Sequence, residues 1–403
     1  MDPIETTEGQ ARLPRYFAQA WGTARQARAG RLDVVLPDGR RFRHAGPEAG
    51  PVAEIVVHDE DVFARLIRDG DIGFIEAYMD GQWDSPDLQA VYDWMYATGD
   101  DLVQAQPGLT LVRAWEKLRF RLRRNSRDQA RRNIAAHYDL GNSFYGMWLD
   151  PSMTYSAAKF EHPQMDLEAA QRAKYASIVD RMDVVPGDHV LEIGCGWGGF
   201  AEYAAAERGL KVTGLTLSRE QLDYARDRMA RAGLSDRVDL ALRDYRDERG
   251  TYDGIASIEM FEAVGQRYWP AYFHTLRERL HPGRQASLQI ITVPDRRWPI
   301  YQRSVDFIQK YIFPGGYLPA PFRLTEEIAR AGLEEGDSLS LAKDYSLTLR
   351  RWHEAFVARW EEVAAQGFDA RFKRMWETYL VSCAGAFEHG NCDVIQMVVR
   401  KPA

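Results

Sequence analysis

Long apolar runs and cysteine are what this sequence has least of. No stretch reaches the roughly 18 consecutive apolar residues of a membrane-spanning helix, and the polar start MDPIETTEGQAR has no signal-peptide pattern. The three cysteines, Cys195, Cys383 and Cys392, are too few and too irregularly spaced for a disulfide framework or a zinc site. We therefore expect a cytoplasmic protein that is neither exported nor membrane-spanning and that binds no metal.

A strong net charge is also missing. The 52 Lys and Arg residues against 59 Asp and Glu residues leave a formal charge of −7, which gives no global attraction to nucleic acid or anionic lipid. Any basic surface must be local, and residues 111–132 are the candidate, since nine of these 22 residues are Lys or Arg and Leu111, Trp115, Leu118 and Leu122 recur at helical spacing. This basic amphipathic helix is predicted to be either a solvated linker or a contact with an anionic membrane surface. No nucleic-acid-binding motif accompanies it.

Length and element order predict two domains joined by that helix. A chain of 403 residues exceeds the usual size of one hydrophobic core. We expect a small α+β domain over residues 1–105, with a strand at 32–36 and helices at 62–68 and 88–98, then a linker helix over 106–135. Residues 136–403 are expected to form the second domain.

Strands and helices alternate in the second domain. The expected strands are 189–193, 211–217, 237–242, 252–258, 285–292 and 393–399, and the expected helices are 200–208, 219–232 and 267–280. Such alternation predicts an α/β fold of the Rossmann-like kind, in which helices cover both faces of a parallel sheet.

The stretch VLEIGCGWGGF, residues 190–200, predicts a nucleotide cofactor. Gly194, Gly196 and Gly199 follow a strand and open a helix, so backbone amides can approach a ligand at the helix N-terminus. An NAD enzyme should carry an acidic residue at the end of the second strand, but that strand ends Thr216-Leu-Ser. The acidic residue is instead Glu192, which favours S-adenosylmethionine (SAM). A glycine turn without a ligand is the alternative.

Two further segments have a predicted place around the cofactor. Asp244 and Tyr245 follow the third strand, where the adenine is expected, with Asp244 accepting from its exocyclic amine and Tyr245 stacking on the ring. Gln221 has two interpretations, because Ser218-x-x-Gln221 is also a capping box for the next helix.

Several short motifs, taken in order, resemble the cyclopropane fatty acid synthases and their mycolic acid methyltransferase relatives. The motifs are AHYDLGN (136–142), LDPSMTYS (149–156), VLEIGCGWGGF (190–200), LTLS with Gln221 (215–221), DYR (244–246), MFE with VG (260–265), KYIFPG (310–315), DY (344–345) and CAGAF (383–387). The joint occurrence of HYDLGN, YIFPGG and CAGAF makes the resemblance specific. It spans about residue 60 to the C-terminus.

The resemblance implies a class I SAM methyltransferase fold with a helical insert over the active site, preceded by a domain similar to lipid-carrier modules. It implies methyl transfer to the double bond of an unsaturated acyl chain in a membrane phospholipid, by a protein that is peripherally associated with the inner face of the cell membrane and forms a homodimer. The aromatic segment 307–319 would line a channel for the acyl chain. The implied cofactor-binding residues are Tyr155, Ser156, Glu192, Gly194, Cys195, Gly196, Thr216, Leu217, Gln221, Asp244, Tyr245, Arg246 and Ile258. The implied catalytic residues are His137, Glu262 and Tyr345.

The chain departs from the resembled family at the proton acceptor. In those enzymes a Cys, a Glu, a His and a Tyr hold a bicarbonate ion that removes a proton from the methylated carbocation. Glu262 and Tyr345 match two of these positions, whereas Ala157 stands at the cysteine and Ile291 at the histidine. Glu259 also stands where the family has a small residue.

These departures leave two interpretations open. One is a working cyclopropane synthase whose bicarbonate is held by Glu262, Tyr345 and backbone amides. The other is a relative that methylates the alkene but disposes of the cation differently, giving methyl-branched, methylene-branched or furan-pathway lipids, with Glu259 or Gln289 replacing the missing groups.

Two functions outside this chemistry compete with it. A methyltransferase of a small oxygen or nitrogen nucleophile would leave HYDLGN and YIFPGG unexplained. A lipid-binding protein without catalysis is disfavoured by the intact Glu192, Gly194 and Gly196.

Overall fold

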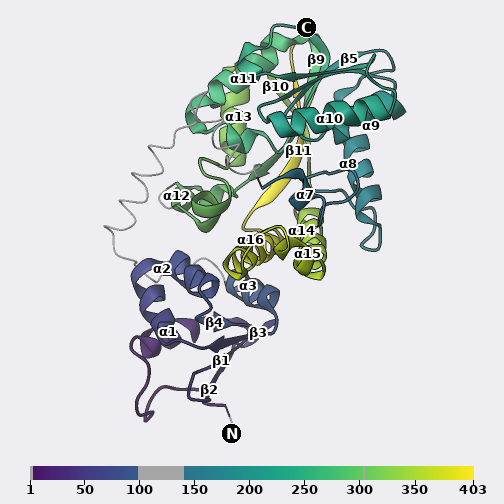
Figure 1. Ribbon diagram of the computed structural model, residues 1–403. Helices are drawn as coiled ribbons and strands as arrows, with labels where there is room; N and C mark the ends of the chain where they lie inside the picture. The colour runs from purple at the N-terminus through teal and green to yellow at the C-terminus, as the bar shows by residue number, and fades with distance from the viewer. Residues whose placement is uncertain (1–2, 99–139, 303–304) are drawn as a thin grey trace. The chain divides into compact units, whose positions relative to one another are not determined.

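The computed structural model describes residues 3–98, 140–302 and 305–403 (Figure 1). The chain divides into two compact units. The first comprises Met1–Arg121, Ser304–Lys310 and Trp360–Asn391, and the second comprises Leu122–Arg303, Tyr311–Arg359 and Cys392–Ala403. The basic segment 111–132 and the predicted catalytic residue His137 lie outside the described residues. Within the described ranges, no helix combines the length and the apolar character needed to cross a membrane.

The first unit is built on a four-stranded sheet with the order β2-β1-β3-β4. Strand β1 pairs antiparallel with β2 and parallel with β3, and β4 pairs antiparallel with β3. The elements are α1 (Phe17–Ala24), β1 (Ala29–Val35), β2 (Arg41–Ala45), β3 (Glu48–Val57), α2 (Asp61–Met79), β4 (Trp83–Asp84), α3 (Leu88–Ala97), α15 (Trp360–Ala364) and α16 (Ala370–Glu388). The small α+β unit expected at the N-terminus is therefore present.

Helix α2 runs further than its hydrophobic pattern predicted. The expected helix ended at Arg68, whereas α2 continues to Met79 across a break at Gly70, whose φ is +69°. The second half buries an apolar face, including Phe74, whose ring stacks on Trp83 with the ring centroids 4.4 Å apart. Glycine permits the break because it has no Cβ to clash at positive φ.

The last helix of the first unit comes from the far end of the chain. Helix α16 packs against α2 and α3, and Val381 is fully buried in the same apolar cluster as Trp83. The Val381 carbonyl accepts a hydrogen bond from Gln89 Nε2 at 3.1 Å, and Arg374 forms an ion pair with Asp84 at 2.8 Å. The predicted boundary at residue 136 assigned this helix to the second domain, so the two divisions of the chain differ over Trp360–Asn391.

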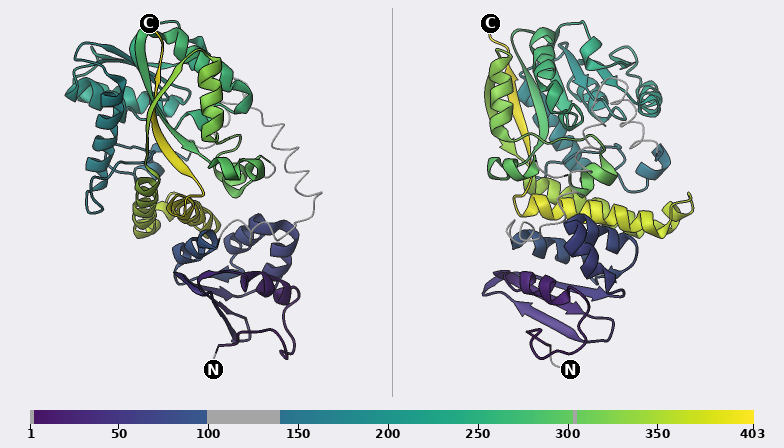
Figure 2. Two further views of the ribbon diagram at one scale, coloured as in Figure 1. Left: turned by 180° about the vertical axis from the view of Figure 1, so that it is seen from behind. Right: turned by 90° about the vertical axis from the view of Figure 1, so that its left-hand side faces the viewer.

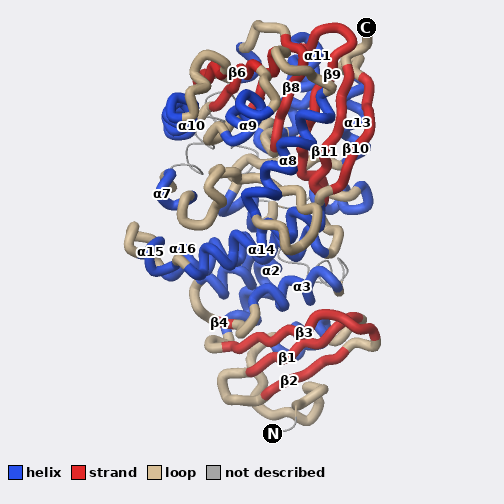
Figure 3. Tube along the Cα trace, turned by 90° about the vertical axis from the view of Figure 1, so that its right-hand side faces the viewer, coloured by secondary structure: helices blue, strands red, loops and turns tan. Residues whose placement is uncertain are grey.

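The second unit contains a seven-stranded sheet with the order β10-β11-β9-β8-β5-β6-β7, drawn in red in Figure 3. Strands β9, β8, β5, β6 and β7 are parallel, and β11 lies antiparallel between β9 and β10. Its strands are β5 (His189–Ile193), β6 (Lys211–Thr216), β7 (Val238–Leu242), β8 (Tyr252–Ile258), β9 (Leu280–Thr292), β10 (Glu334–Ser340) and β11 (Asp393–Arg400). The predicted parallel sheet is confirmed.

Helices cover both faces of this sheet (Figure 1, Figure 2). The helices of the second unit are α7 (Asn142–Tyr145), α8 (Leu167–Met182), α9 (Gly199–Glu207), α10 (Arg219–Arg231), α11 (Trp269–Arg279), α12 (Trp298–Tyr301), α13 (Pro321–Arg330) and α14 (Ala342–Ala358). Its short helical turns are η1 (Tyr245–Asp247), η2 (Phe261–Ala263), η3 (Gln266–Tyr268) and η4 (Asp295–Arg297). A π-helical turn, η5 (Ile308–Ile312), includes residues of both units. Val190 of β5 belongs to the core beneath α8, α9 and α10, whereas Leu191 and Ile193 belong to the core beneath α11 and α13. Burial on both faces explains the apolar run of this strand.

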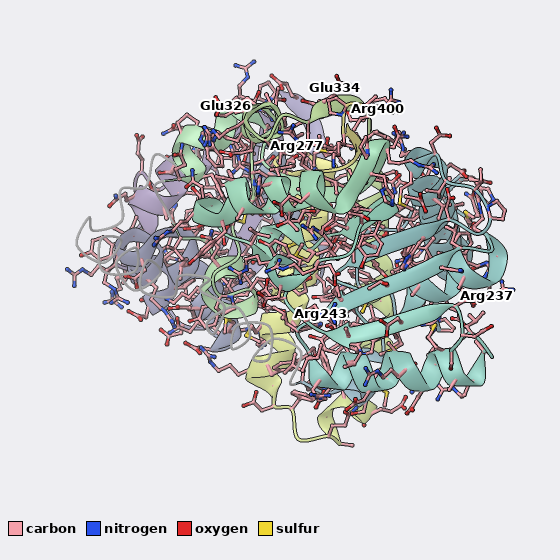
Figure 4. The ribbon with its side chains drawn as sticks, turned by 90° about the horizontal axis from the view of Figure 1, so that it is seen from above. Arg237, Arg243, Arg277, Glu326, Glu334 and Arg400 are labelled. Atoms are coloured by element: carbon pink, nitrogen blue, oxygen red, sulfur yellow. The ribbon has the colours of Figure 1, made fainter. Side chains whose placement is uncertain are left out.

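The strand order reverses between β5 and β8. The chain passes from β5 to β6 and β7 on one side, and from β8 to β9 on the other. Ligands of open parallel sheets bind at the carboxyl ends of the strands beside such a reversal. Figure 4 labels Arg237 and Arg243, which flank the two ends of β7. The side marked by Arg243 is the carboxyl edge at which the predicted cofactor residues gather.

Candidate active site

The glycine loop joins β5 to α9 at this carboxyl edge. Gly194, Gly196 and Gly198 have φ values of +90°, +51° and +83°, a conformation that other residues adopt only with strain. A Cβ at Gly196 would meet no atom within 4 Å, whereas one at Gly194 would lie 2.8 Å from Met260 Cγ. Helix α9 begins at Gly199 without a side-chain cap. The loop thus offers open space at Gly196 and backbone amides beside it, a cradle that fits the methionine end of SAM.

Glu192 lies beneath the loop on the α8 side of β5. Burial raises the pKa of Glu192 to about 8, against the charges of Lys174 and Arg228, and one carboxylate oxygen has no hydrogen-bond partner among the described residues. Lys174, which the sequence did not single out, is fully buried, and burial lowers its pKa to about 8. Its Nζ donates a hydrogen bond of 2.6 Å to Ser156 Oγ. Lys174 therefore positions one predicted cofactor residue and faces another.

The turn after β6 forms only half of the predicted capping box. Ser218 caps α10, because its Oγ accepts a hydrogen bond from the Gln221 N–H at 3.3 Å. The Gln221 side chain does not complete the reciprocal capping box; instead its Oε1 accepts from Thr216 Oγ1 at 3.1 Å. Leu217, between them, is only partly buried. Cofactor binding by Thr216, Leu217 and Gln221 stays a prediction.

The segment after β7 is already paired within itself. The Asp244 carboxylate accepts hydrogen bonds from Arg246 Nε at 2.8 Å and Nη2 at 2.5 Å, and the Tyr245 ring packs edge-on against Tyr272 with the centroids 5.6 Å apart. Ile258 ends β8 and is partly buried. These residues share the carboxyl edge with the glycine loop, and the adenine contacts assigned to Asp244 and Tyr245 stay predictions.

The HYDLGN motif meets the glycine loop through its last residue. Trp197 Nε1, inside the loop, donates a hydrogen bond of 2.6 Å to Asn142 Oδ1. The Trp197 ring lies 5.1 Å from that of Tyr145, and Cys195 in the same loop is buried. Burial raises the pKa of the Cys195 thiol well above its usual range, so the thiol is not a reactive group, and the cofactor contact implied for Cys195 stays a prediction.

Glu262 and Ile291 meet at the predicted catalytic centre. Glu262 Oε1 accepts a hydrogen bond from the Ile291 backbone N–H at 2.5 Å, while its Oε2 is buried without a partner in the described part of the chain. Burial, together with the neighbouring charge of Glu259, raises the pKa of Glu262 to about 8. The position that lacks an imidazole thus still supplies a backbone donor, and Glu262 holds a proton at neutral pH.

Glu259 occupies the other side of this centre. Glu259 Oε1 accepts hydrogen bonds from the Ala157 N–H and from Gln289 Nε2, both at 2.7 Å, and its carboxylate also bonds the Tyr345 side chain. Burial raises the pKa of Glu259, and these hydrogen bonds oppose the rise because they favour the ionised form. The structure therefore brings Glu262 and Tyr345 together with all three departures from the family pattern, Ala157, Ile291 and Glu259.

An aromatic wall borders the same centre. Tyr155 lies at its middle, with ring centroids 5.5 Å from Tyr145, 5.5 Å from Trp148, 5.3 Å from Trp352 and 6.4 Å from Phe313. Trp352 also packs edge-on against Tyr345. Phe313 belongs to the aromatic segment that was expected to line an acyl channel. Aromatic faces exclude water and attract cations, so the wall suits a reaction that passes through a carbocation.

The raised pKa of Glu262 predicts a pH-dependent stability. Its folded-state pKa of about 8 lies above the ordinary value of 4.5, so its contribution is complete below pH 4.5 and is lost as the pH rises through about 8. Glu262→Gln removes this dependence. The free energy of unfolding of the wild type should therefore fall relative to Glu262→Gln by up to about 1.4 kcal/mol per pH unit over this range.

Denaturant unfolding of both proteins at a series of pH values measures that difference. Glu220→Gln, at an exposed glutamate of α10, is the control and should follow the wild type. Parallel curves for the wild type and Glu262→Gln would show that Glu262 is ionised throughout.

Comparison with known proteins identifies the family. Residues 125–397 match the family model described as mycolic acid cyclopropane synthetase. The chain is 42% identical over 380 residues to the tuberculostearic acid methyltransferase UfaA1 of Mycobacterium tuberculosis, covering 91% of this chain and 86% of that protein. It is 35% identical to the cyclopropane-fatty-acyl-phospholipid synthase of Escherichia coli, covering 91% and 95%.

Solved structures agree with this assignment. The cyclopropane synthase MmaA2 from Mycobacterium tuberculosis matches with a TM-score of 0.64 and 31% identity, over 67% of this chain and 98% of that one. The mycolic acid cyclopropane synthase CmaA1, in complex with SAH and CTAB, matches with a TM-score of 0.63 and 30% identity, over the same shares. The predicted methyltransferase fold and SAM cofactor are confirmed, and the chain belongs to the mycolic acid cyclopropane synthetase family as a SAM-dependent methyltransferase that modifies lipids.

Proposed function

We propose that this enzyme methylates the double bond of an unsaturated acyl chain in a membrane phospholipid and that its main product is a methyl- or methylene-branched chain instead of a cyclopropane. The observation that carries the proposal is the filled anion pocket. The Ala157 N–H, the Gln289 amide and the Tyr345 side chain all bond to the carboxylate of Glu259, so the donors that would bind a free bicarbonate are already used. The 42% identity to a protein named as a tuberculostearic acid methyltransferase supports the same direction.

The rest of the site suits methylation of an alkene. When bound, SAM supplies an activated methyl group as a sulfonium. An alkene is a weak nucleophile, so the site must lower the barrier by positioning the reactants, and the rigid loop from Gly194 to Gly198 serves that purpose. The wall around Tyr155 and Trp352 keeps water from the cation that follows.

The phospholipid substrate implies work at a membrane surface. The basic segment 111–132, with nine Lys or Arg residues, supports peripheral contact with anionic headgroups, each basic residue contributing about 1 kcal/mol near such a surface. The likeness to a cyclopropane-fatty-acyl-phospholipid synthase along 91% of the chain supports a phospholipid acceptor.

An ordinary cyclopropane synthase is the second candidate. The same likeness favours it, as does the Ile291 N–H, which donates to Glu262 Oε1 at 2.5 Å and so supplies a backbone donor where the imidazole is missing. In that case a bicarbonate ion would displace Glu259 from its donors.

Product analysis separates the two candidates. The purified protein is incubated with SAM and vesicles of an unsaturated phospholipid, either anionic or zwitterionic, with and without bicarbonate, and the acyl chains are identified by mass spectrometry. We expect branched chains, faster turnover on anionic vesicles and little effect of bicarbonate. A product that is mainly cyclopropane and requires bicarbonate would establish the ordinary synthase.

A further inference from the structure

Glu259 is a strained residue placed where the reaction occurs. It directly follows β8 at the carboxyl edge of the sheet and has a φ of +47°. A non-glycine residue in this left-handed region costs about 1 kcal/mol or more, and such strain persists where the surrounding structure holds it. A glycine would fit this backbone without strain, so the side chain of Glu259 must offer something that a small residue would not.

The carboxylate of Glu259 is held by a chain of buried polar groups. Gln289 donates to it at 2.7 Å, and Gln289 Oε1 in turn accepts from Gln396 Nε2 at 3.0 Å. Gln396 Oε1 accepts from Ser177 Oγ at 2.6 Å. Both glutamines are fully buried. Buried protein donors orient a carboxylate more firmly than water molecules do, because no water has to be displaced or reordered when the carboxylate reacts.

The two carboxyl groups of the site have unequal surroundings. Glu259 accepts hydrogen bonds from Ala157, Gln289 and Tyr345, whereas Glu262 accepts from the Ile291 N–H and keeps its second oxygen unpartnered within the described ranges. Donors favour the charged form of an acid, and a neighbouring charge favours the neutral form. One proton shared by this pair therefore resides on Glu262 and leaves Glu259 as the carboxylate.

We propose that Glu259 is the general base of the reaction, a carboxylate built into the chain that takes the place of an external bicarbonate. This inference rests on the proposed function, since it needs a methylated acyl cation in the site. A C–H bond on a carbon adjacent to the cationic carbon breaks, its electron pair forms a C=C bond that neutralises the cation, and the proton passes to a carboxylate oxygen of Glu259. The acid form of Glu259 then releases the proton to water when the product leaves. Gln289 acts as a positioning residue for this carboxylate.

Chemical rescue tests this role. Glu259→Gly removes the base and relieves the backbone strain, while Glu259→Gln fills the same space with an amide that cannot accept the proton. Both variants should fold, bind SAM and lose about a hundredfold or more of total acyl methylation, the range that general bases contribute. Sodium formate or sodium bicarbonate should raise the methylation rate of Glu259→Gly at least about tenfold, because the anion can bind the hydrogen-bond donors that Glu259 no longer occupies. Neither anion should raise the rate of Glu259→Gln, whose amide fills the same space.

Glu327→Gln is the matched control. Glu327 is a glutamate of α13 with 2% exposure that pairs with Arg330 at 2.7 Å, so its change also replaces a buried carboxylate by an amide, and methylation should stay within a few-fold of the wild type. Full activity of Glu259→Gln, or a folded, SAM-binding Glu259→Gly that neither anion restores, would overturn the role of Glu259. The wild-type product tests the proposed function separately, so the role of Glu259 can fail while the branched product stands.

Discussion

A Gly196→Ala protein is expected to bind SAM at least about tenfold more weakly than the wild type, a loss of about 1.4 kcal/mol, while remaining folded. Gly196 has a φ of +51°, and a Cβ there would meet no protein atom within 4 Å. The added methyl group therefore projects into the space that the cofactor must fill. The backbone strain itself costs about 1 kcal/mol of folding stability.

Gly233→Ala separates strain from obstruction. Gly233 has a φ of +68°, a Cβ there would also meet no atom within 4 Å, and the residue follows α10 outside the loop. It should lose a similar amount of stability and bind SAM like the wild type. Calorimetric titration with SAM and thermal unfolding of the three proteins give both quantities. Unchanged affinity in Gly196→Ala would place the cofactor elsewhere.

The triple variant Ala157→Cys/Ile291→His/Glu259→Gly is expected to make mainly cyclopropane and to depend on bicarbonate. It removes the internal carboxylate and adds the thiol and imidazole found at these positions in the resembled family. Each charge-assisted contact contributes about 1.5–3 kcal/mol, so the two added contacts together should raise anion occupancy by about a hundredfold or more. A mobile anion bound between Glu262 and Tyr345 would then select which proton leaves.

The double variant Ala157→Cys/Ile291→His is the control for this change. It keeps Glu259 on its donors, so it should retain branched products and respond weakly to bicarbonate. Mass spectrometry of the acyl chains from vesicles, with and without bicarbonate, compares wild type, double and triple variants. Identical product spectra in all three would mean that the pocket does not determine the fate of the cation.

The central strands of the second sheet were predictable because a strand that is buried on both faces consists of a nearly continuous run of apolar residues. Strands β5 and β8 match the expected 189–193 and 252–258 to the residue. Strand β9 begins at Leu280, five positions before the expected start at 285. The early start was not predicted because His281-Pro-Gly-Arg284 has the composition of a turn. Local composition cannot show which turn-like residues a neighbouring strand will pair.

The site was predictable as a set of motifs and less so as a set of contacts. The glycine loop and Glu262 follow from their spacing and from the family resemblance, and Glu259 was visible as a departure. Its bond to Ala157 joins residues 102 positions apart in sequence, which no local pattern reports. Lys174 has one signal, its place on an apolar stripe between Ala170 and Ile178, where a charged residue needs a buried partner.

The late position of α16 and β11 in the chain sets an order on biosynthesis. By the time the ribosome has made β4, all four strands of the first sheet exist, but Val381, which is buried against them, has yet to be synthesised. Strand β11 likewise pairs between β9 and the edge strand β10, although it is made after both of them. Nascent domains with unfilled cores expose apolar surface until they are completed. Neither unit can close until these late elements have been made, so a newly made chain is most vulnerable to chaperone capture or aggregation in the interval before their synthesis.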